Sequence, residues 1–279
     1  MSKLLLVAIL GLLLLSGSAS SATAPRRIVS LAPTATETLF AIGAGKQVVA
    51  VDDQSDYPAQ APHTKLSGFT PNVEAIAGYR PDLVVVSYDP GGLVSGLRGL
   101  GIPVLVQDAA KDFAGMYAGI AQLGRVTGHV AEATSLVARM KRQIASLVAK
   151  NTRRARGLTV YHELGPDLYS VTSKTFIGRV YSLFGLKNIA DAADSTGSGY
   201  PKLSEEYVVS HSPDVVVLAD IHSCEQSPRT VAARPGWKNV SAVRTGTIVR
   251  VDDSIASRWG PRVVNFVRAI AAALAHLRR

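Results

Sequence analysis

NVEAIAGYRPDLVVVS, residues 72–87, recurs with small changes as EEYVVSHSPDVVVLA, residues 205–219. This repeat is the main indication of the fold. Each stretch begins with a helical pattern, breaks at a proline, and continues as a run of valines and leucines typical of a buried strand. An offset of 132 residues separates Glu74 from Glu206 and also Pro81-Asp82 from Pro213-Asp214. One α/β unit therefore occurs twice, which predicts two related lobes.

Both halves of the chain continue this alternation of strands and helices. In the first half we expect strands in 26–33, 47–53 and 101–108, a helix in 34–43 and a long loop in 54–71; in the second half we expect strands in 157–163 and 246–253 and a helix in 175–186. The strands are unbroken runs of Val, Leu and Ile, a pattern typical of parallel sheets with both faces covered. The fold class is therefore α/β.

Residues 129–156 lie between the two halves and contain neither proline nor glycine. Their apolar residues recur at helical spacing, with Arg and Lys between them. This pattern predicts a single long helix, 128–156, between an N-terminal lobe, 25–127, and a C-terminal lobe, 157–279. A continuous helix resists bending, so we expect the lobes to move little. Because ligands bind beyond the carboxyl ends of parallel strands, we expect a ligand cleft between the lobes.

The N-terminus has the layout of a secretory signal peptide, which we assign to residues 1–24. Lys3 precedes an apolar run, Leu4–Leu15, and Ala22-Thr23-Ala24 forms an A-x-A cleavage site. Cys224 is the only cysteine, so no internal disulfide can form and no cysteine after the apolar run can carry a lipid. We expect a protein of the periplasm or another extracytoplasmic space, and not a lipoprotein.

The formal net charge of +9 raises the question of nucleic acid as a partner. The charge is scattered apart from 150–156 (KNTRRAR) and Arg278-Arg279, and no aromatic residues are interleaved with either run. Export also separates the chain from nucleic acid. We therefore interpret the basic residues as a solvated surface.

No catalytic or nucleotide-binding motif is present: the chain lacks G-x-S-x-G, a Walker loop, H-E-x-x-H and C-x-x-C. His222 and Cys224 could bind a soft metal, but an exposed loop with a lone thiol is the favoured interpretation. We predict no metal site, no cofactor of its own and no enzymatic activity.

Aromatic side chains are scarce, yet several follow predicted strands, where they would border a cleft. They suit a bulky, partly apolar ligand, with a few polar groups to orient it. The candidate ligand-binding residues are Phe69, Tyr88, Tyr169, Tyr200, Asp253, Arg258 and Trp259. Glu74 and Glu206 form a second candidate set. Each stands near a helix start, where a carboxylate is stabilised by the helix dipole, and the pair could also dock a two-fold symmetric partner that carries arginines.

RIVSLAPTATETLFAIGAG, the SDYP at 55–58 and the paired E-x6-PD-[VL]VV units resemble the periplasmic binding proteins of ABC importers for cobalamin, ferric siderophores and haem. The resemblance covers the chain from about residue 26 onward. It implies two Rossmann-like lobes joined by one long helix, and capture of a metal chelate for delivery to a permease dimer driven by a cytoplasmic ATPase. Glu74 and Glu206 match the docking glutamates of that family. We expect a monomer.

Within the family, GPDLYSVTSKTF and YPKLSEE look most like the cobalamin-binding branch. The match places Phe69, Tyr88, Tyr169, Tyr200 and Arg258 near cleft positions, with Pro33, Gln54 and Asp253 as further candidates. Phe69 and Tyr200 stand where that branch often has tryptophan, so the ligand identity stays open.

Several alternatives remain at this level. A ferric siderophore would need several cleft arginines, and only Arg258 and Arg262 are available. Haem could use Tyr88 or Tyr169 as an iron ligand. From other classes, a sensory receptor could dock a signalling partner through the same glutamates, and a secreted metal-dependent enzyme would need a cluster of His162, Glu163, Asp252 and Asp253.

Overall fold

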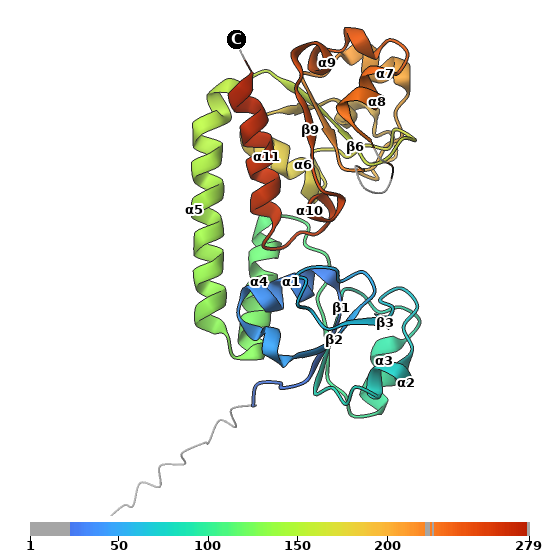
Figure 1. Ribbon diagram of the computed structural model, residues 1–279, viewed down its shortest axis with the longest axis vertical. Coiled ribbons are helices and arrows are strands. Elements are labelled where there is room, and N and C mark those ends of the chain that lie inside the picture. The colour runs from blue at the N-terminus through green and yellow to red at the C-terminus, as the bar shows by residue number, and fades with distance from the viewer. Residues whose placement is uncertain (1–22, 221–223, 225, 278–279) are drawn as a thin grey trace, which may run out of the picture.

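The computed structural model describes residues 23–220, 224 and 226–277. Two separate parallel sheets form the two lobes (Figure 1). The N-terminal sheet has the order β3-β2-β1-β4-β5, with β1 Ile28–Leu31, β2 Val48–Asp52, β3 His63–Leu66, β4 Leu83–Val86 and β5 Val104–Val106. The C-terminal sheet has the order β7-β6-β8-β9, with β6 Thr159–Glu163, β7 Lys187–Asn188, β8 Val215–Leu218 and β9 Ile248–Arg250. The predicted α/β class with two parallel sheets is confirmed.

Helices cover both faces of each sheet, so successive strand residues enter different cores. In β4, Val84 and Val86 pack in an outer core, whereas Leu83 and Val85 belong to a central core that continues into the second lobe. The helices of the first lobe are α1 Pro33–Ala41, η1 Ala44–Gln47, α2 Val73–Ala77, α3 Leu93–Gly99 and α4 Phe113–Thr127. Those of the second are α6 Phe176–Phe184, η2 Ile189–Ala193, α7 Glu205–His211, α8 Pro228–Ala232, η3 Trp237–Asn239, α9 Ser241–Thr245, α10 Asp253–Ser257 and α11 Val263–His276.

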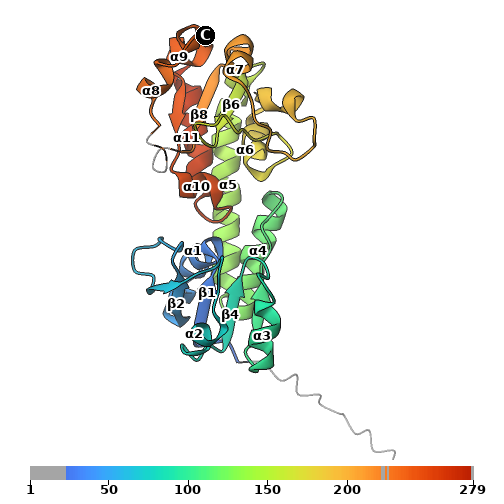
Figure 2. The same ribbon diagram turned by 90° about the vertical axis from the view of Figure 1, so that its right-hand side faces the viewer.

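A single helix, α5 Val130–Ala155, runs along both lobes, as the uninterrupted pattern predicted (Figures 1 and 2). Its buried face carries Ala133, Leu136, Met140 and Ile144 at helical spacing. Helix α4 packs against α5 from the first lobe and α11 packs against it from the second. The three helices therefore form a shared spine that holds both lobes. The assigned lobe limits, 25–127 and 157–279, stay a prediction.

The repeated unit keeps the same local contacts in both lobes. Asn72 caps α2 by accepting a hydrogen bond from the Ala75 amide (2.7 Å), and Ser204 caps α7 in the same way (3.1 Å to the Tyr207 amide). The residues before the two prolines, Arg80 and Ser212, both take a left-handed conformation, with φ of 49° and 41°. The helix ends and the turn into the next strand are therefore alike.

The aspartate of each Pro-Asp pair anchors its strand to a neighbour. The Asp82 carboxylate accepts hydrogen bonds from the backbone amides of Arg26 and Arg27, at the start of β1 (2.7 and 2.8 Å). Asp214 accepts from the backbone amide of Thr159, at the start of β6 (2.9 Å), and from the Ser241 hydroxyl (3.0 Å). The repeated Pro-Asp therefore has a structural explanation: each carboxylate holds the amino ends of two adjacent strands together.

One predicted loop was wrong in part. Residues 54–71 were expected to be irregular, but His63–Leu66 forms the edge strand β3, parallel to β2. Its side chains are mostly polar and exposed, because an edge strand on a sheet margin buries little. The hydrophobic pattern that identified the other strands is therefore missing here.

Candidate functional site

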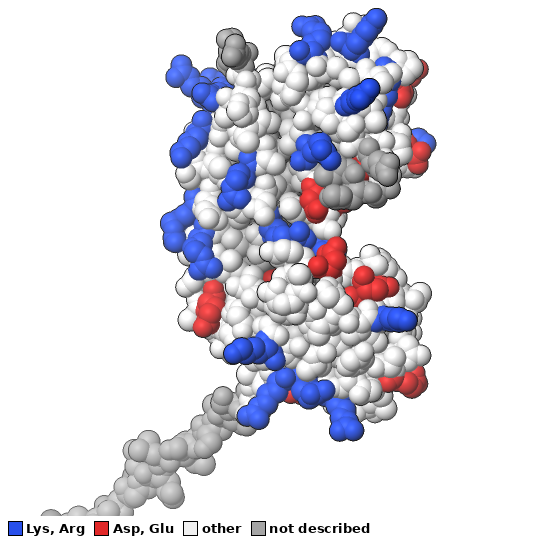
Figure 3. All heavy atoms as spheres, in the orientation of Figure 1, with Lys and Arg blue, Asp and Glu red and all other residues white. Residues whose placement is uncertain are grey.

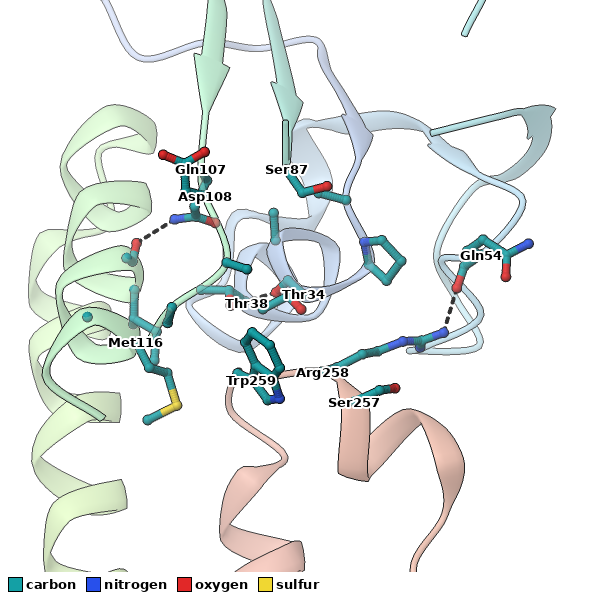
Figure 4. Close-up of a pocket in the computed structure, with 18 of the residues that line it drawn as sticks. Thr34, Thr38, Gln54, Ser87, Gln107, Asp108, Met116, Ser257, Arg258 and Trp259 are labelled. Atoms are coloured by element: carbon teal, nitrogen blue, oxygen red, sulfur yellow. Dashed lines mark hydrogen bonds between the residues drawn. The ribbon is translucent and has the colours of Figure 1, made fainter. Parts of the chain in front are cut away.

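A pocket of about 360 Å³ lies at the carboxyl ends of the first-lobe strands. Pro33, Ser87 and Gln107 line it, and they closely follow β1, β4 and β5 respectively. Its remaining surface is largely apolar and includes Ala35 from α1 and Met116 from α4 (Figure 4). The site therefore stands where an open parallel sheet is expected to bind a ligand.

The second lobe supplies the roof of this pocket. It consists of Ser257, the last residue of α10, and of Arg258 and Trp259, which follow this helix (Figure 4). The Trp259 indole stacks on Phe176 (centroids 5.1 Å apart, 18° between planes), and Phe176 contacts Phe113 of α4 (5.2 Å). Among the described residues, the buried indole N–H of Trp259 has no hydrogen-bond partner. Trp259 therefore offers a fixed aromatic surface, while its N–H is buried and without a partner among the described residues.

An ion-pair network joins the roof to helix α1 and to the 54–56 segment of the first lobe. Glu37 of α1 is 2% exposed and accepts two hydrogen bonds from Arg262, from Nε (2.9 Å) and from Nη2 (2.5 Å). Arg258 contacts the same carboxylate (3.3 Å), pairs closely with Asp56, and donates to the Gln54 carbonyl (2.6 Å). Both arginines belong to the second lobe, and their acceptors belong to the first.

The pKa values of the network follow from these pairs. Burial favours the neutral form of Asp56, but hydrogen bonding and attraction from Arg258 outweigh burial and lower the pKa of this carboxyl. Burial likewise opposes the charged form of Arg262, but its hydrogen bonds to Glu37 prevail and raise its pKa. Both shifts favour the charged forms of Asp56 and Arg262. The network pairs two carboxylates with two guanidinium groups, so its formal charges balance.

The pocket brings together three of the predicted ligand-binding residues, Phe69, Arg258 and Trp259, with the further candidates Pro33 and Gln54. Phe69 is 68% exposed, so its ring is available to a ligand. Arg258 is not free, because Glu37 and Asp56 already neutralise it. The sequence reasoning missed Glu37, whose position within an apolar helix pattern marked it only as an ordinary helix residue.

The other predicted aromatics lie outside the pocket. Tyr88 follows Ser87, beyond the carboxyl end of β4, and is 42% exposed. Tyr169 and Tyr200 are also exposed, and Lys202 pairs with the Tyr169 backbone and places its Nζ 5.6 Å from the Tyr169 ring centroid. The Tyr169 carbonyl accepts from the Leu164 amide, so this segment adjoins the carboxyl end of β6. A direct role of these rings in binding stays a prediction.

The polar cluster required by an enzyme is not assembled. His162 points into the central core, where its Nδ1 lies 2.5 Å from the Tyr181 hydroxyl, and burial lowers its pKa to about 3. Glu163 points to the opposite face and forms two hydrogen bonds of 2.7 Å with Arg234. Alternation along a strand therefore separates the two residues that the sequence places side by side.

Three aspartates follow the second-lobe strands β8 and β9. Burial, followed by repulsion from Glu163, raises the pKa of Asp220 to about 6. Asp252 caps α10 through the Ile255 amide (3.0 Å), and Asp253 is the first residue of that helix. The described part of the chain holds no group of three His, Cys, Asp or Glu side chains able to hold a metal ion. His222 lies outside the described residues, and Cys224 is exposed.

Glu74 and Glu206 are exposed at the second position of α2 and α7, one in each lobe. The two helices lie at distant ends of the molecule, on the side away from α5 (Figure 1). Hydrogen bonds from its own backbone amide and from Ser204 lower the pKa of Glu206. Two matching carboxylates are therefore presented on one side of the protein.

Charge is distributed unevenly over the surface. Basic side chains follow the exposed face of α5, including Arg139, Lys141, Arg142, Lys150 and Arg153. Acidic side chains border the hollow between the lobes, on the side away from α5 (Figure 3).

No helix within the described residues is long and apolar enough to span a membrane.

Known proteins resemble this chain over most of its length. A cobalamin-binding protein of Halobacterium salinarum is 36% identical over 259 residues, covering 89% of this chain and 69% of the relative. YvrC of Bacillus subtilis, an uncharacterized ABC transporter substrate-binding lipoprotein, is 29% identical, covering 90% and 80%. The periplasmic haem-binding protein HutB of Vibrio cholerae has a similar fold, with a TM-score of 0.78, 24% identity, and coverage of 88% and 97%.

A family model described as periplasmic binding protein matches residues 28–255. With two parallel-sheet lobes on a helical spine and a pocket between them, the chain belongs to the periplasmic binding protein family and is an extracytoplasmic solute-binding protein of an ABC importer, not an enzyme.

Proposed function

We propose that this protein captures cobalamin or a related corrinoid and delivers it to the permease of an ABC importer. The observation that carries this proposal is the lack of an unpaired cation among the described residues that line the pocket: its wall is mainly apolar, its lining arginine, Arg258, is paired with Glu37 and Asp56, and Asp108 adds a carboxylate. A largely apolar site without an unpaired cation favours a corrinoid over an anionic siderophore, which needs unpaired cations. The name of the Halobacterium relative supports the same ligand class.

The pocket is smaller than a corrinoid, so it would hold only part of the ligand. The remainder would lie in the wider hollow between the lobes, against the exposed rings of Phe69, Tyr88, Tyr169 and Tyr200. Aromatic rings bury a large apolar area at little entropic cost, which suits a broad macrocycle. Asp253 would orient its polar groups, and the Trp259 indole would add a further ring.

Haem is the second candidate ligand. The exposed hydroxyl-bearing rings of Tyr88 and Tyr169 favour it, since tyrosine can serve as an axial ligand of haem iron, and HutB has a similar fold. Haem carries two propionates, however, and the paired state of Arg258 leaves little free positive charge in the pocket. We therefore rank haem below a corrinoid.

Calorimetric titration of the purified protein with cyanocobalamin, hemin and a ferric hydroxamate tests this ranking. We expect one-to-one binding of cyanocobalamin, weakened roughly tenfold by Phe69→Ala or Tyr200→Ala, which corresponds to about 1.4 kcal/mol. Leu100→Ala is the matched control. Leu100 is also exposed, but it precedes β5 and so lies near the amino ends of the strands, away from the pocket. Binding of hemin or the hydroxamate alone would overturn the corrinoid assignment and keep the transport class.

We also propose that Glu74 and Glu206 dock with arginines on the two permease subunits. The same residue at the same helix position in both lobes suits a two-fold symmetric partner. Glu74→Arg and Glu206→Arg should abolish delivery to the permease in proteoliposomes and leave cyanocobalamin affinity unchanged. Glu132→Arg, on the exposed face of α5, is the control. Normal uptake with both reversed charges would refute this docking surface.

For localisation, we propose that the protein acts without a lipid anchor, as a monomer, after removal of residues 1–24. The only cysteine, Cys224, is exposed in the second lobe and is not placed to carry a lipid near a signal sequence. YvrC is called a lipoprotein, so the two would differ in attachment. Mass spectrometry of the exported chain and its partition in detergent test this: a lipid-modified N-terminus would contradict it.

A further inference from the structure

Two arginines at the roof of the pocket bind first-lobe residues that are more than 200 positions away in the sequence. Arg258 and Arg262 reach from the second lobe to Glu37, Asp56 and the Gln54 carbonyl of the first. Gly260 lies between the two arginines, and a methyl group on it would stand 3.2 Å from Thr34 Cγ2. The roof therefore sits in close contact with α1.

Glu37 occupies the centre of this contact. One of its oxygens, Oε1, accepts from both guanidinium groups, 3.3 Å from Arg258 and 2.5 Å from Arg262. The carboxylate is almost fully buried, and both arginine side chains are more than 85% buried. Two cations held this close repel each other strongly in a partly dry environment unless an anion lies between them.

We propose that Glu37 is a positioning residue for ligand binding: by holding Arg258 and Arg262, it keeps Trp259 over the first-lobe pocket before any ligand arrives. The pocket is then formed in advance, and a ligand does not have to bring the lobes together. Because this role concerns the proposed binding site, it rests on the proposed function, but its structural part can be measured without ligand.

The other contacts of the roof are compatible with this role. Arg262 also lies over the Tyr57 ring (4.4 Å), next to Asp56, so that the 54–57 segment holds the same two arginines from the exposed side. Trp259 stacks on Phe176 of its own lobe, and Phe176 contacts Phe113 of the first lobe, so this aromatic contact also links the roof to the first lobe. The ion pairs centred on Glu37 are the polar part of the same junction.

Tryptophan fluorescence gives a direct test, because the chain has only two tryptophans. Trp237 is fully buried and is a constant signal, whereas Trp259 lines the pocket. In ligand-free Glu37→Gln we expect a red-shifted emission and greater quenching by acrylamide than in the wild type. Glu132→Gln, the same chemical change on an exposed site, should match the wild type.

Spin labels measure the lobes themselves. In a Cys224→Ser background, Ser95→Cys on α3 and Ser210→Cys on α7 place one exposed label in each lobe. We expect a narrow distance distribution for the parent protein and a broader one, shifted to longer distances, after Glu37→Gln. If Glu37→Gln does not fold, Arg262→Lys keeps the charge but loses the two-point hydrogen bonding, and it should give the same changes to a smaller extent.

The outcomes separate this inference from the proposed function. Unchanged Trp259 quenching and unchanged label distances in the folded variants would overturn the positioning role, whatever the protein binds. If the parent protein binds cyanocobalamin, Glu37→Gln should weaken binding roughly tenfold while secondary structure is kept. If the parent binds no cyanocobalamin but the ligand-free changes appear, the proposed ligand fails and the positioning of the roof stands.

Discussion

The two lobes share one structural unit but differ in where their buried glutamates find a partner. In the first lobe, Glu37 pairs with Arg262 of the other lobe; in the second, Glu163 pairs with Arg234 of its own. Both carboxylates are at most 2% exposed, and both meet a guanidinium through two hydrogen bonds. Similar chemistry therefore joins the lobes in one case and stabilises a single lobe in the other.

The two lobes share the contacts at helix starts and at the amino ends of strands, but they differ at the carboxyl ends of the strands. Caps, turns before proline and the Asp82 and Asp214 anchors recur because each α/β unit needs them to fold. These shared contacts do not involve the carboxyl ends of the strands. In the first lobe the residues at these ends line a largely apolar pocket, and in the second they include the buried Glu163, which pairs with Arg234.

The largest expected effect is on the free energy of unfolding, and it differs between the two buried glutamates. Glu163→Gln leaves Arg234 without its anion inside one lobe, which should lower the free energy of unfolding by about 3–5 kcal/mol. Glu37→Gln should cost less, because the lobes can separate and hydrate Arg258 and Arg262. Urea denaturation followed by circular dichroism measures both. A larger loss for Glu37→Gln than for Glu163→Gln would contradict this contrast.

Acid should destabilise the second lobe through the protonation of His162. Its pKa is about 3 in the fold and about 6.5 when unfolded, so the unfolded chain takes up the proton first. The contribution of His162 to stability is complete above pH 6.5 and falls by about 1.4 kcal/mol for each pH unit between 6.5 and 3. Urea titrations at a series of pH values measure this slope, and His162→Asn should remove it. The same slope in wild type and variant would exclude His162 as the cause.

The aspartate anchors give the next contrast. Asp214 is half-buried and binds Thr159 and Ser241, whereas Asp82 is exposed and binds two backbone amides. Asp214→Ala should cost about 2–3 kcal/mol, since hydrogen bonds to a charged group are strong when sheltered, and Asp82→Ala should cost less. Hydrogen exchange of the amides at the starts of β6 and β1 reports each loss locally. Equal losses would mean that exposure does not govern the anchors.

The smallest effect concerns the helix caps. Asn72→Ala and Ser204→Ala each remove one side-chain acceptor at a helix start, and each should cost about 1 kcal/mol. Because both helices are short and equivalent in the two lobes, the two losses should agree closely in thermal unfolding. A marked difference would show that the repeated units are not energetically equivalent.

Much of the fold could be predicted from local patterns. The repeated helix–proline–strand unit identified β4 and β8, and the unbroken apolar spacing identified α5, because periodicity and capping act between near neighbours. Edge strand β3 was missed, since its exposed polar side chains leave no such pattern. The position of a site at strand carboxyl ends also followed from the parallel sheets alone.

The composition of the site depended on the tertiary structure. Strand order could not show that Arg258, a predicted ligand contact, would be neutralised by Glu37 and Asp56. Nor could it show that His162 and Glu163 face opposite cores. The repeated unit and the helical connector were predictable from the sequence because they depend on local spacing, and the family was predictable from its resemblance to known binding proteins. Only the packing of two lobes brought residue 37 to residue 262, since contacts between distant positions depend on how all the elements between them are placed.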